Sequence, residues 1–362
     1  MSTGCEQMQV NWVGEDEGVP VTPAATVAPD GSGGAVVQFI RNALSHDPPY
    51  RVALLADVDG PVRSAFLQRL ASYPDWALSQ PSDGVGLRQG RSVLALLGGI
   101  DDFPEAIIGQ SADAWEPVVL QEFDPSGGHG IATSRDYFVT TTSGAIGAGR
   151  YDGTMPWQMI SNAGSQLLDP TPWGETIFWR DSNASTIGRV ISWSATTGVA
   201  PFISFGNDTT QAVYGFNTDG THHAWVHFKD KPETCGYNPD TCPYATADIM
   251  AAPFTSDPSA LSPKRLRSWP SNRLLPRPVS VGCGYVAYGY SPGHTLIVRI
   301  EDGVSWELPS TNCTPPNFAG DWCFEQVFGI TCDHVYVRGG IGVSAKITRA
   351  AIAALGPGTP PD

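Results

Sequence analysis

The sequence is poor in charged residues and contains no run of basic ones. Asp, Glu, Lys and Arg make up 16% of the chain, against about 25% in an average domain. The 36 acidic residues outnumber the 21 basic ones and give a net charge of −15. Because an acidic surface repels phosphate groups, we expect no nucleic acid partner. The chain also lacks an apolar stretch of about 18 residues, so no membrane-spanning helix is predicted.

The usual sequence signatures of catalysis are missing as well. There is no Gly-x-Ser-x-Gly or Ser-x-x-Lys motif that would mark an activated serine. The Gly-rich stretch DPSGGHG at residues 124–130 includes His129 but lacks the lysine of a Walker A loop, which favours a simple turn. The sequence therefore indicates no particular reaction.

Two pairs of acidic residues are candidates for a cation site. Asp57 and Asp59 occur in LADVDG, and Asp101 and Asp102 occur in GGIDDF. A calcium loop begins with Asp-x-Asp, but its later Asp or Asn and its closing Glu are absent here. The preferred interpretation is that all four are turn residues that bond to the backbone. Asp57 and Asp59 are the candidate metal ligands among them.

Three histidines gather in VYGFNTDGTHHAWVHFKD, residues 213–230. Side chains on a strand alternate between its two faces, so His223 and His227 would share one face and His222 would lie on the other. His223 and His227 would then be about 13 Å apart, too far to share a metal ion. We expect strand histidines that pack against aromatic rings or bond to carbonyl groups. His222 is a candidate metal ligand, together with a residue from another loop.

Short β-forming runs alternate with turn residues along most of the chain, and the 40 glycines and 31 prolines are spread among them. Seven of these runs can be aligned, at intervals of mostly about 40 residues. They are YRVALLADVDG, RSVLALLGGI, RDYFVTTTSG, GETIFWRDS, THHAWVHFKD, GYVAYGYSP and DHVYVRGG.

This period predicts an all-β fold, a β-propeller of four-stranded antiparallel blades. Seven blades are favoured, and six is the alternative because residues 35–123 are the least regular. Two units divide readily into four strands each. The expected strands are SQLLDPTPWG, ETIFWRDS, GRVISWSATTG and VAPFISFGN in one unit, and QAVYGFNTDG, THHAWVHFKD, ADIMAAPF and KRLRSWP in the next.

The last unit is expected to lack its outer strand. Residues 249–263 and 343–357 align without gaps and both end in Ala-Leu-x-Pro, but only the first copy continues into another strand. A strand from the N-terminal part, EQMQVNWVG or AVVQFI, would complete the unit and close the propeller. Residues 1–34 are accordingly expected to form an arm or linker that can donate an outer strand, and residues 35–362 a single propeller domain.

The cysteines favour an oxidising compartment. Six of the seven lie between residues 235 and 332, and none shows the short Cys-x(2–4)-Cys spacing of a zinc site. We therefore predict disulfides Cys235–Cys242 and Cys313–Cys323, each closing a short loop, and Cys283–Cys332 between similar places in adjacent units. The alternative is Cys283–Cys313 with Cys323–Cys332.

Cys5 stands apart from the other cysteines. Thr3-Gly4-Cys5 resembles the end of a bacterial lipobox, whose cysteine is lipidated, although Ser2 stands where that motif has an apolar residue. Lipidation of Cys5 is thus one prediction, and a free cysteine in a terminal tail is the alternative.

The stretch GFNTDGTHHAWVHFKD resembles the propeller repeat of TolB-like proteins. Phe216, Asp219, Gly220, Ala224 and Trp225 fill the places of that pattern. Asn and Thr replace its Ser-Pro, and a histidine replaces an aliphatic residue. The overall composition is also similar to uncharacterised secreted propellers of high-GC bacteria. The resemblance covers about a tenth of the chain and implies the propeller fold rather than an activity.

The preferred hypothesis is an exported, non-enzymatic propeller that binds a protein or glycan partner at one face of its disc. We expect a monomer that is periplasmic, anchored to the outer membrane or extracellular, and that reaches a membrane only through a lipid anchor. No cofactor is predicted, with a structural or channel Ca²⁺ as the alternative. The second hypothesis is a hydrolase or lyase that acts at the central channel with a divalent ion.

Overall fold

The computed structural model describes the first part of the chain only as strand backbones. These are residues 6–7, 27–29, 35–40, 50–56, 62–67, 85–88, 91–96, 105–111 and 114–123. From residue 131 on, the structure describes residues 131–142, 145–161, 166–182, 188–206, 208, 210–230, 246–270, 279–290, 294–308, 326–339 and 346–361.

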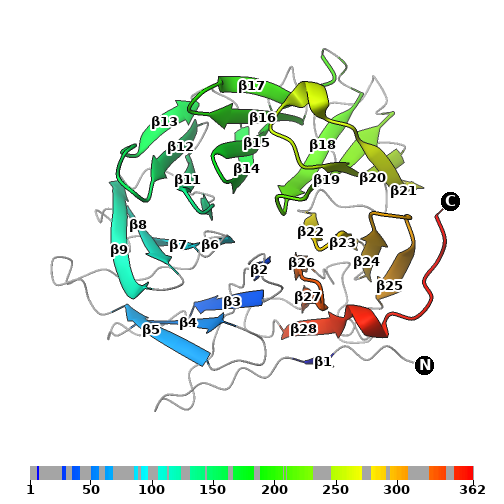
Figure 1. Ribbon diagram of the computed structural model, residues 1–362, viewed down its shortest axis with the longest axis horizontal. Coiled ribbons are helices and arrows are strands. Elements are labelled where there is room, and N and C mark those ends of the chain that lie inside the picture. Colours follow the sequence, from blue (N-terminus) through cyan, green and yellow to red (C-terminus); the bar gives the residue numbers. More distant parts are fainter. Residues whose placement is uncertain are drawn as a thin grey trace, which may run out of the picture. The chain divides into compact units, whose positions relative to one another are not determined.

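The described strands form seven four-stranded antiparallel sheets (Figure 1), which confirms the prediction of an all-β fold. The only helices among the described residues are short 3₁₀ turns, and none of them could cross a membrane. The chain divides into two compact units, Gln9–Gly164 and Met1–Met8 with Ser165–Asp362, which we call the N-terminal and C-terminal units.

The N-terminal unit contains three of the sheets, each with its strands in chain order. Their strands are β2 (Val27–Pro29), β3 (Ala35–Ile40), β4 (Tyr50–Ala56) and β5 (Val62–Leu67); β6 (Val85–Arg88), β7 (Arg91–Leu96), β8 (Glu105–Ser111) and β9 (Ala114–Phe123); β10 (Ile131–Thr133), β11 (Tyr137–Thr142), β12 (Ala145–Arg150) and β13 (Gln158–Ser161).

The C-terminal unit contains the other four sheets. The first three comprise β14 (Gln166–Trp173), β15 (Thr176–Ser182), β16 (Arg189–Ser194) and β17 (Gly198–Ile203); β18 (Ala212–Thr218), β19 (His222–Lys229), β20 (Thr246–Pro253) and β21 (Lys264–Pro270); β22 (Ser280–Gly282), β23 (Tyr285–Tyr290), β24 (His294–Arg299) and β25 (Ser305–Leu308). The fourth comprises β26 (Gln326–Ile330), β27 (His334–Gly339), β28 (Lys346–Ala351) and β1 (Glu6–Gln7).

Six of the seven aligned sequence runs correspond to one strand position. Six runs contain the second strand of a different sheet, namely β7, β11, β15, β19, β23 and β27, whereas YRVALLADVDG contains β4, the third strand of its sheet. The strands expected in the two divided units also coincide with β14–β17 and β18–β21. One repeat of about 40 residues in the sequence therefore corresponds to one four-stranded sheet.

Successive sheets of the C-terminal unit pack face to face. Ala224, Val226 and Phe228 on one face of β19 share a core with β22–β24. Trp225, on the other face, shares a core with Phe178 of β15 and other apolar residues of the preceding sheet. The alternation of side chains along β19 thus supplies two cores from one strand. A third core joins β23–β25 to β26–β28 in the same way.

A hydrogen bond recurs at the same place in four sheets. The last residue of the turn between the first two strands offers its carbonyl group to the residue that follows the third strand. The pairs, with the donor first, are Tyr151–Asp136, Phe254–Thr221, Ile300–Gly284 and Ile352–Asp333, at 2.7–3.1 Å. The recurrence shows that these sheets repeat one folded unit.

The last sheet takes its outer strand from the other end of the sequence. β1 pairs with β28, with Glu6 opposite Arg349 and Gln7 opposite Thr348 (Figure 1). Of the two segments considered for this place, AVVQFI instead forms β3 inside a sheet of the N-terminal unit. β1 and β2 both lie within residues 1–34.

Candidate functional site

The C-terminal unit has two ends with different connections. The turns between first and second strands, at residues 174–175, 219–221, 283–284 and 331–333, lie at one end, which we call the turn end. Contacts between neighbouring turns place them there, because Gly220 packs on Trp173, Gly282 packs on Ile330, and Cys283 is bonded to Cys332. At the opposite end, the loop end, β19 ends at Lys229 and β20 begins at Thr246.

The turn end is closed by its own hydrogen bonds. Asp219 accepts bonds from the backbone of Thr221 at 2.8 Å and of His222 at 2.7 Å, and Thr218 Oγ1 donates to the His222 carbonyl at 2.8 Å. Asp257 bonds in the same way to Ser259. These two acidic residues are occupied as hydrogen-bond acceptors within their own turns.

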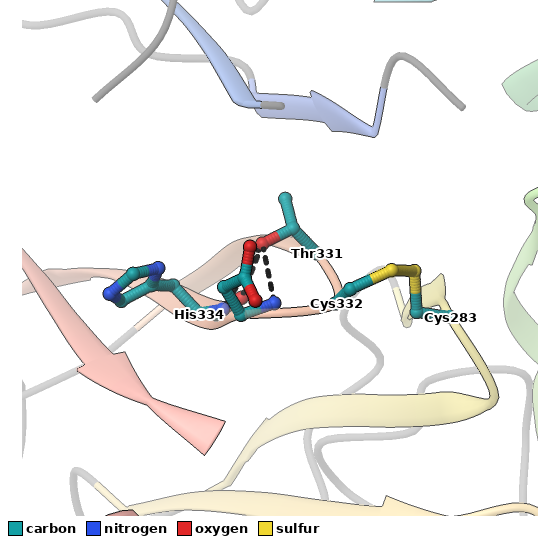
Figure 2. Close-up of a disulfide and its surroundings, with 5 residues drawn as sticks. Cys283, Thr331, Cys332 and His334 are labelled. Atoms are coloured by element: carbon teal, nitrogen blue, oxygen red, sulfur yellow. Dashed lines mark hydrogen bonds between the residues drawn. A yellow bond between two sulfur atoms is a disulfide. The ribbon is translucent and has the colours of Figure 1, made fainter. Parts of the chain in front are cut away.

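A disulfide joins two turns of the turn end (Figure 2). Cys283 and Cys332 have Cα atoms 5.0 Å apart and bridge the last two sheets, as preferred from the sequence. Beside it, Thr331 Oγ1 accepts a hydrogen bond from the His334 amide at 3.1 Å. This pairing excludes the alternative connectivity through Cys283. Cys5, Cys235, Cys242, Cys313 and Cys323 lie outside the described residues.

His223 belongs to the core rather than to a site. Its side chain is fully buried among Phe178, Phe202, Phe216 and Phe254, with ring centroids 4.9–5.3 Å away. Its Nε2 lies 2.8 Å from the Thr255 carbonyl oxygen. Burial lowers the pKa of His223 to about 4, so the ring is neutral at pH 7. The expectation of a histidine packed among aromatic rings holds here.

His227 lies at the loop end in a hydrogen-bonded chain. Its Nε2 is 2.8 Å from Gln211 Oε1, and Gln211 Nε2 donates to Asp208 Oδ2 at 2.5 Å. A carboxylate only accepts, so it orients the amide, and the amide oxygen in turn places the imidazole proton on Nε2. The ring stacks on Phe205 with 4.5 Å between centroids. Burial, followed by the charge of Lys229, lowers the pKa of His227 to about 4.

A buried ion pair lies next to His227. Asp248, opposite His227 on β20, is 1% exposed, and its Oδ2 meets the ammonium group of Lys229. Asp230, the next residue, is exposed and accepts a bond from Thr246 Oγ1 at 3.3 Å. The preceding sheet has a similar pair, since Asp181, 2% exposed, binds Arg189 at 2.6 Å. Charges at this end are thus fixed by partners on adjacent strands.

These ion pairs could hardly be predicted from the sequence. A single acidic residue in the apolar strand TADIMAAP, and a lysine at the end of the strand before it, were the available signals. Their meeting depends on the register in which β19 and β20 pair, which places Lys229 opposite Thr246 and beside Asp248.

His222 lies at the turn end, away from His227. Its Nδ1 is buried and makes no hydrogen bond to another described residue.

No three His, Cys, Asp or Glu side chains in the described ranges could hold a metal ion together. Asp57, Asp59, Asp101, Asp102 and His129 lie outside those ranges. The described loop end therefore offers polar contacts of mixed charge rather than a metal centre.

Several solved structures resemble this one. An oligogalacturonate lyase in complex with manganese has a TM-score of 0.60 at 10% identity, covering 92% of this chain and 91% of that chain. The Swd1 β-propeller domain of Myceliophteria thermophila has a TM-score of 0.54 at 12% identity, covering 93% and 98%. A streptogramin B lyase has a TM-score of 0.52 at 12% identity, covering 96% and 97%.

No protein-family model and no curated protein matches the chain. At identities this low the structural likeness shows the β-propeller fold and nothing about activity.

Proposed function

We propose that the chain is an exported, non-enzymatic β-propeller that binds a protein or glycan partner at the loop end. In this proposal the seven sheets are the blades of one propeller, which β1 closes by completing the last blade. The protein acts as a monomer, and any membrane attachment is through a lipid on Cys5. The disulfide Cys283–Cys332 supports export, because such bonds persist in oxidising compartments.

The contrast between the two ends carries the proposal. At the turn end, carboxylates and hydroxyls are consumed by their own turns, and a disulfide joins two of them. At the loop end, Asp208 also bonds to Thr210 of its own turn, but its second oxygen accepts from Gln211, whose amide oxygen bonds to His227. The exposed carboxylate of Asp230 lies nearby. Rigid polar groups on a scaffold suit recognition, because little entropy is lost when a partner binds.

The connections of the chain agree with this choice of end. Residues 231–245 link β19 to β20 and residues 309–325 link β25 to β26, and both segments attach at the loop end. They are longer than the turns of the opposite end, and binding residues in many folds are carried by such connections. The enzymatic alternative rests on analogy with other propellers that are enzymes.

A matched pair of charge reversals tests the binding end. Asp230→Lys alters the loop end, and Glu301→Lys reverses an exposed acidic residue near the turn end. Wild type and both variants would be applied to a printed glycan array and to proteins from secreted and membrane fractions, with each hit purified and titrated by calorimetry. Thermal melts would confirm that all three chains are folded.

We expect Asp230→Lys to weaken the confirmed interaction by about tenfold or more and Glu301→Lys to leave it within about twofold. Equal affinity of all three chains would refute the loop end as the binding face, as would a loss confined to Glu301→Lys. Turnover of a bound glycan would support the enzymatic alternative and overturn the non-enzymatic proposal.

A further inference from the structure

The C-terminal segment Leu355–Pro361 lies against the rim of the neighbouring sheet. After β28 the chain forms a 3₁₀ turn, η4 (Ile352–Ala354), and then runs beside β25 towards β21 (red in Figure 1). Apart from Leu355, which is buried, the segment is largely exposed. It therefore covers the outer edge of β25, which no other described strand pairs with.

Three donors of the rim bind three carbonyl groups of the segment. The Ser305 amide donates to the Thr359 carbonyl at 2.9 Å, and the Thr359 amide donates back at 2.7 Å. Trp306 Nε1 donates to Gly356 O at 3.1 Å. From β21, Arg267 Nη1 donates to Pro360 O at 2.9 Å. The segment is thus held through its backbone, mainly as an acceptor.

This pattern of bonds suits a peptide that contains proline. Pro357, Pro360 and Pro361 lack an amide hydrogen, so a sheet edge alone could pair with them only poorly. An indole N–H and a guanidinium group supply donors that need only carbonyl acceptors, which is how aromatic-lined surfaces recognise extended proline-rich segments.

Gly358 adds a requirement for a specific residue. Its φ of +71° lies in the left-handed region that favours glycine. A Cβ at this position would lie 2.8 Å from Cε2 of Trp306 and 2.5 Å from Cγ1 of Val304. Any larger residue would therefore push the segment off the indole ring.

We propose that the edge of β25, Trp306 and Arg267 form a binding site for an extended peptide of the type Gly-Pro-Gly-Thr-Pro-Pro, which the protein's own segment Gly356–Pro361 fills. One reciprocal pair of backbone bonds and two side-chain bonds hold the segment, so it can exchange with a peptide of the same chemistry. The site lies on the rim, apart from the loop end, and does not depend on the function proposed there.

The test uses a chain that ends at Leu355 and a fluorescein-labelled peptide GPGTPPD, with binding followed by fluorescence polarisation. The truncated chain should bind the peptide saturably, and the full-length chain should bind it at least about tenfold more weakly because its site is occupied. Absence of saturable binding to the folded truncated chain, or equal binding to both chains, would overturn the proposal.

Two matched comparisons identify the site. In the truncated chain, Arg267→Ala should weaken peptide binding by about threefold to tenfold, whereas Arg265→Ala, an exposed neighbour on the same strand, should not. A peptide with alanine in place of Gly358 should not bind.

If truncation prevents folding, the full-length variant Gly358→Ala takes the place of the truncated chain, because that change should release the segment and let the wild-type peptide bind. Failure of that variant to bind the peptide would count against the site.

Discussion

Gly220 combines two requirements at a single residue. Its φ of +79° belongs to the left-handed region, and a Cβ there would collide with the ring of Trp173 in the preceding sheet. Gly174 occupies the corresponding turn of that preceding sheet, with φ of +53°, but a Cβ there would meet no atom within 4 Å. Alanine at Gly174 would therefore strain the backbone alone, whereas alanine at Gly220 would strain the backbone and also clash with a neighbouring side chain.

We predict that Gly220→Ala lowers the free energy of unfolding by about 2–4 kcal/mol, and Gly174→Ala by only about 1–2 kcal/mol. Urea unfolding followed by tryptophan fluorescence measures both. Equal losses in the two variants would show that the contact between Gly220 and Trp173 does not stabilise the packing of the sheets.

His223 should make stability depend on pH. Burial lowers its pKa from 6.5 to about 4, so the unfolded chain binds a proton more readily than the folded one in that interval. Stability is therefore greatest above about pH 6.5 and falls as the pH approaches 4, by up to about 3 kcal/mol from this residue. We predict a smaller pH dependence in His223→Gln, measured as the difference in unfolding free energy between pH 7 and pH 4.5. A variant with the same pH dependence as the wild type would contradict this assignment.

The histidines also show what the sequence could predict about single residues. Alternation along a strand separated His222 from His223 correctly, and the run of aromatic residues nearby made a packed histidine the expected outcome. The chain from Asp208 through Gln211 to His227 could not be predicted, because it links a loop to a strand through side chains. Such contacts depend on loop conformation, which leaves no periodic pattern.

The hairpin between β22 and β23 illustrates how an element relies on a distant bond. Its two turn residues, Cys283 and Gly284, both have positive φ, +50° and +79°, as a tight hairpin turn requires. Cysteine is an unusual residue for the left-handed region, where Asn and Gly are preferred. Its disulfide partner, Cys332, is 49 residues further along the chain, so the bond fixes this turn to the next sheet.

Removal of this disulfide should destabilise the C-terminal unit. For a loop of this length the chain-entropy model gives about 4 kcal/mol. We predict a loss of about 2–4 kcal/mol for Cys283→Ser with Cys332→Ser, and a smaller loss for Cys283→Asn with Cys332→Ser, because Asn accepts the left-handed conformation. Thermal melts of the two double variants, with the reduced wild type as reference, test the difference. If both variants melted like the oxidised wild type, the bond would have no structural role.

At the level of elements, the repeat was predictable but its register was not. The gapless match of residues 249–263 to 343–357 aligns the 3₁₀ turns η1 (Pro258–Ala260) and η4 (Ile352–Ala354). The strands before them differ, because residues 254–257 separate β20 from η1, whereas β28 runs directly into η4. The sequence similarity of the two segments reflects the shared Ala-Leu-x-Pro turn. The positions of the strands before it are set instead by the pairing of β20 with β19 and of β28 with β27.

For the whole molecule, the decisive feature is how the last sheet is completed. Spacing of the runs predicted the sheets, and the missing outer strand at the C-terminus predicted a borrowed one. Which N-terminal segment fills the place could not be read from the sequence, since EQMQVNWVG and AVVQFI are both short β-forming runs. The structure pairs β1 with β28 and uses AVVQFI elsewhere.

The central claim is that the seven sheets form one propeller that β1 closes. Scanning calorimetry of a chain lacking residues 1–7, compared with one lacking only residues 1–4, tests this claim most directly. We predict one cooperative transition in both chains, with a melting temperature several degrees lower when β1 is removed, because the edge of β28 loses its backbone partners. Identical melting temperatures in the two deletions, or two separate transitions in the full-length chain, would contradict the closed propeller.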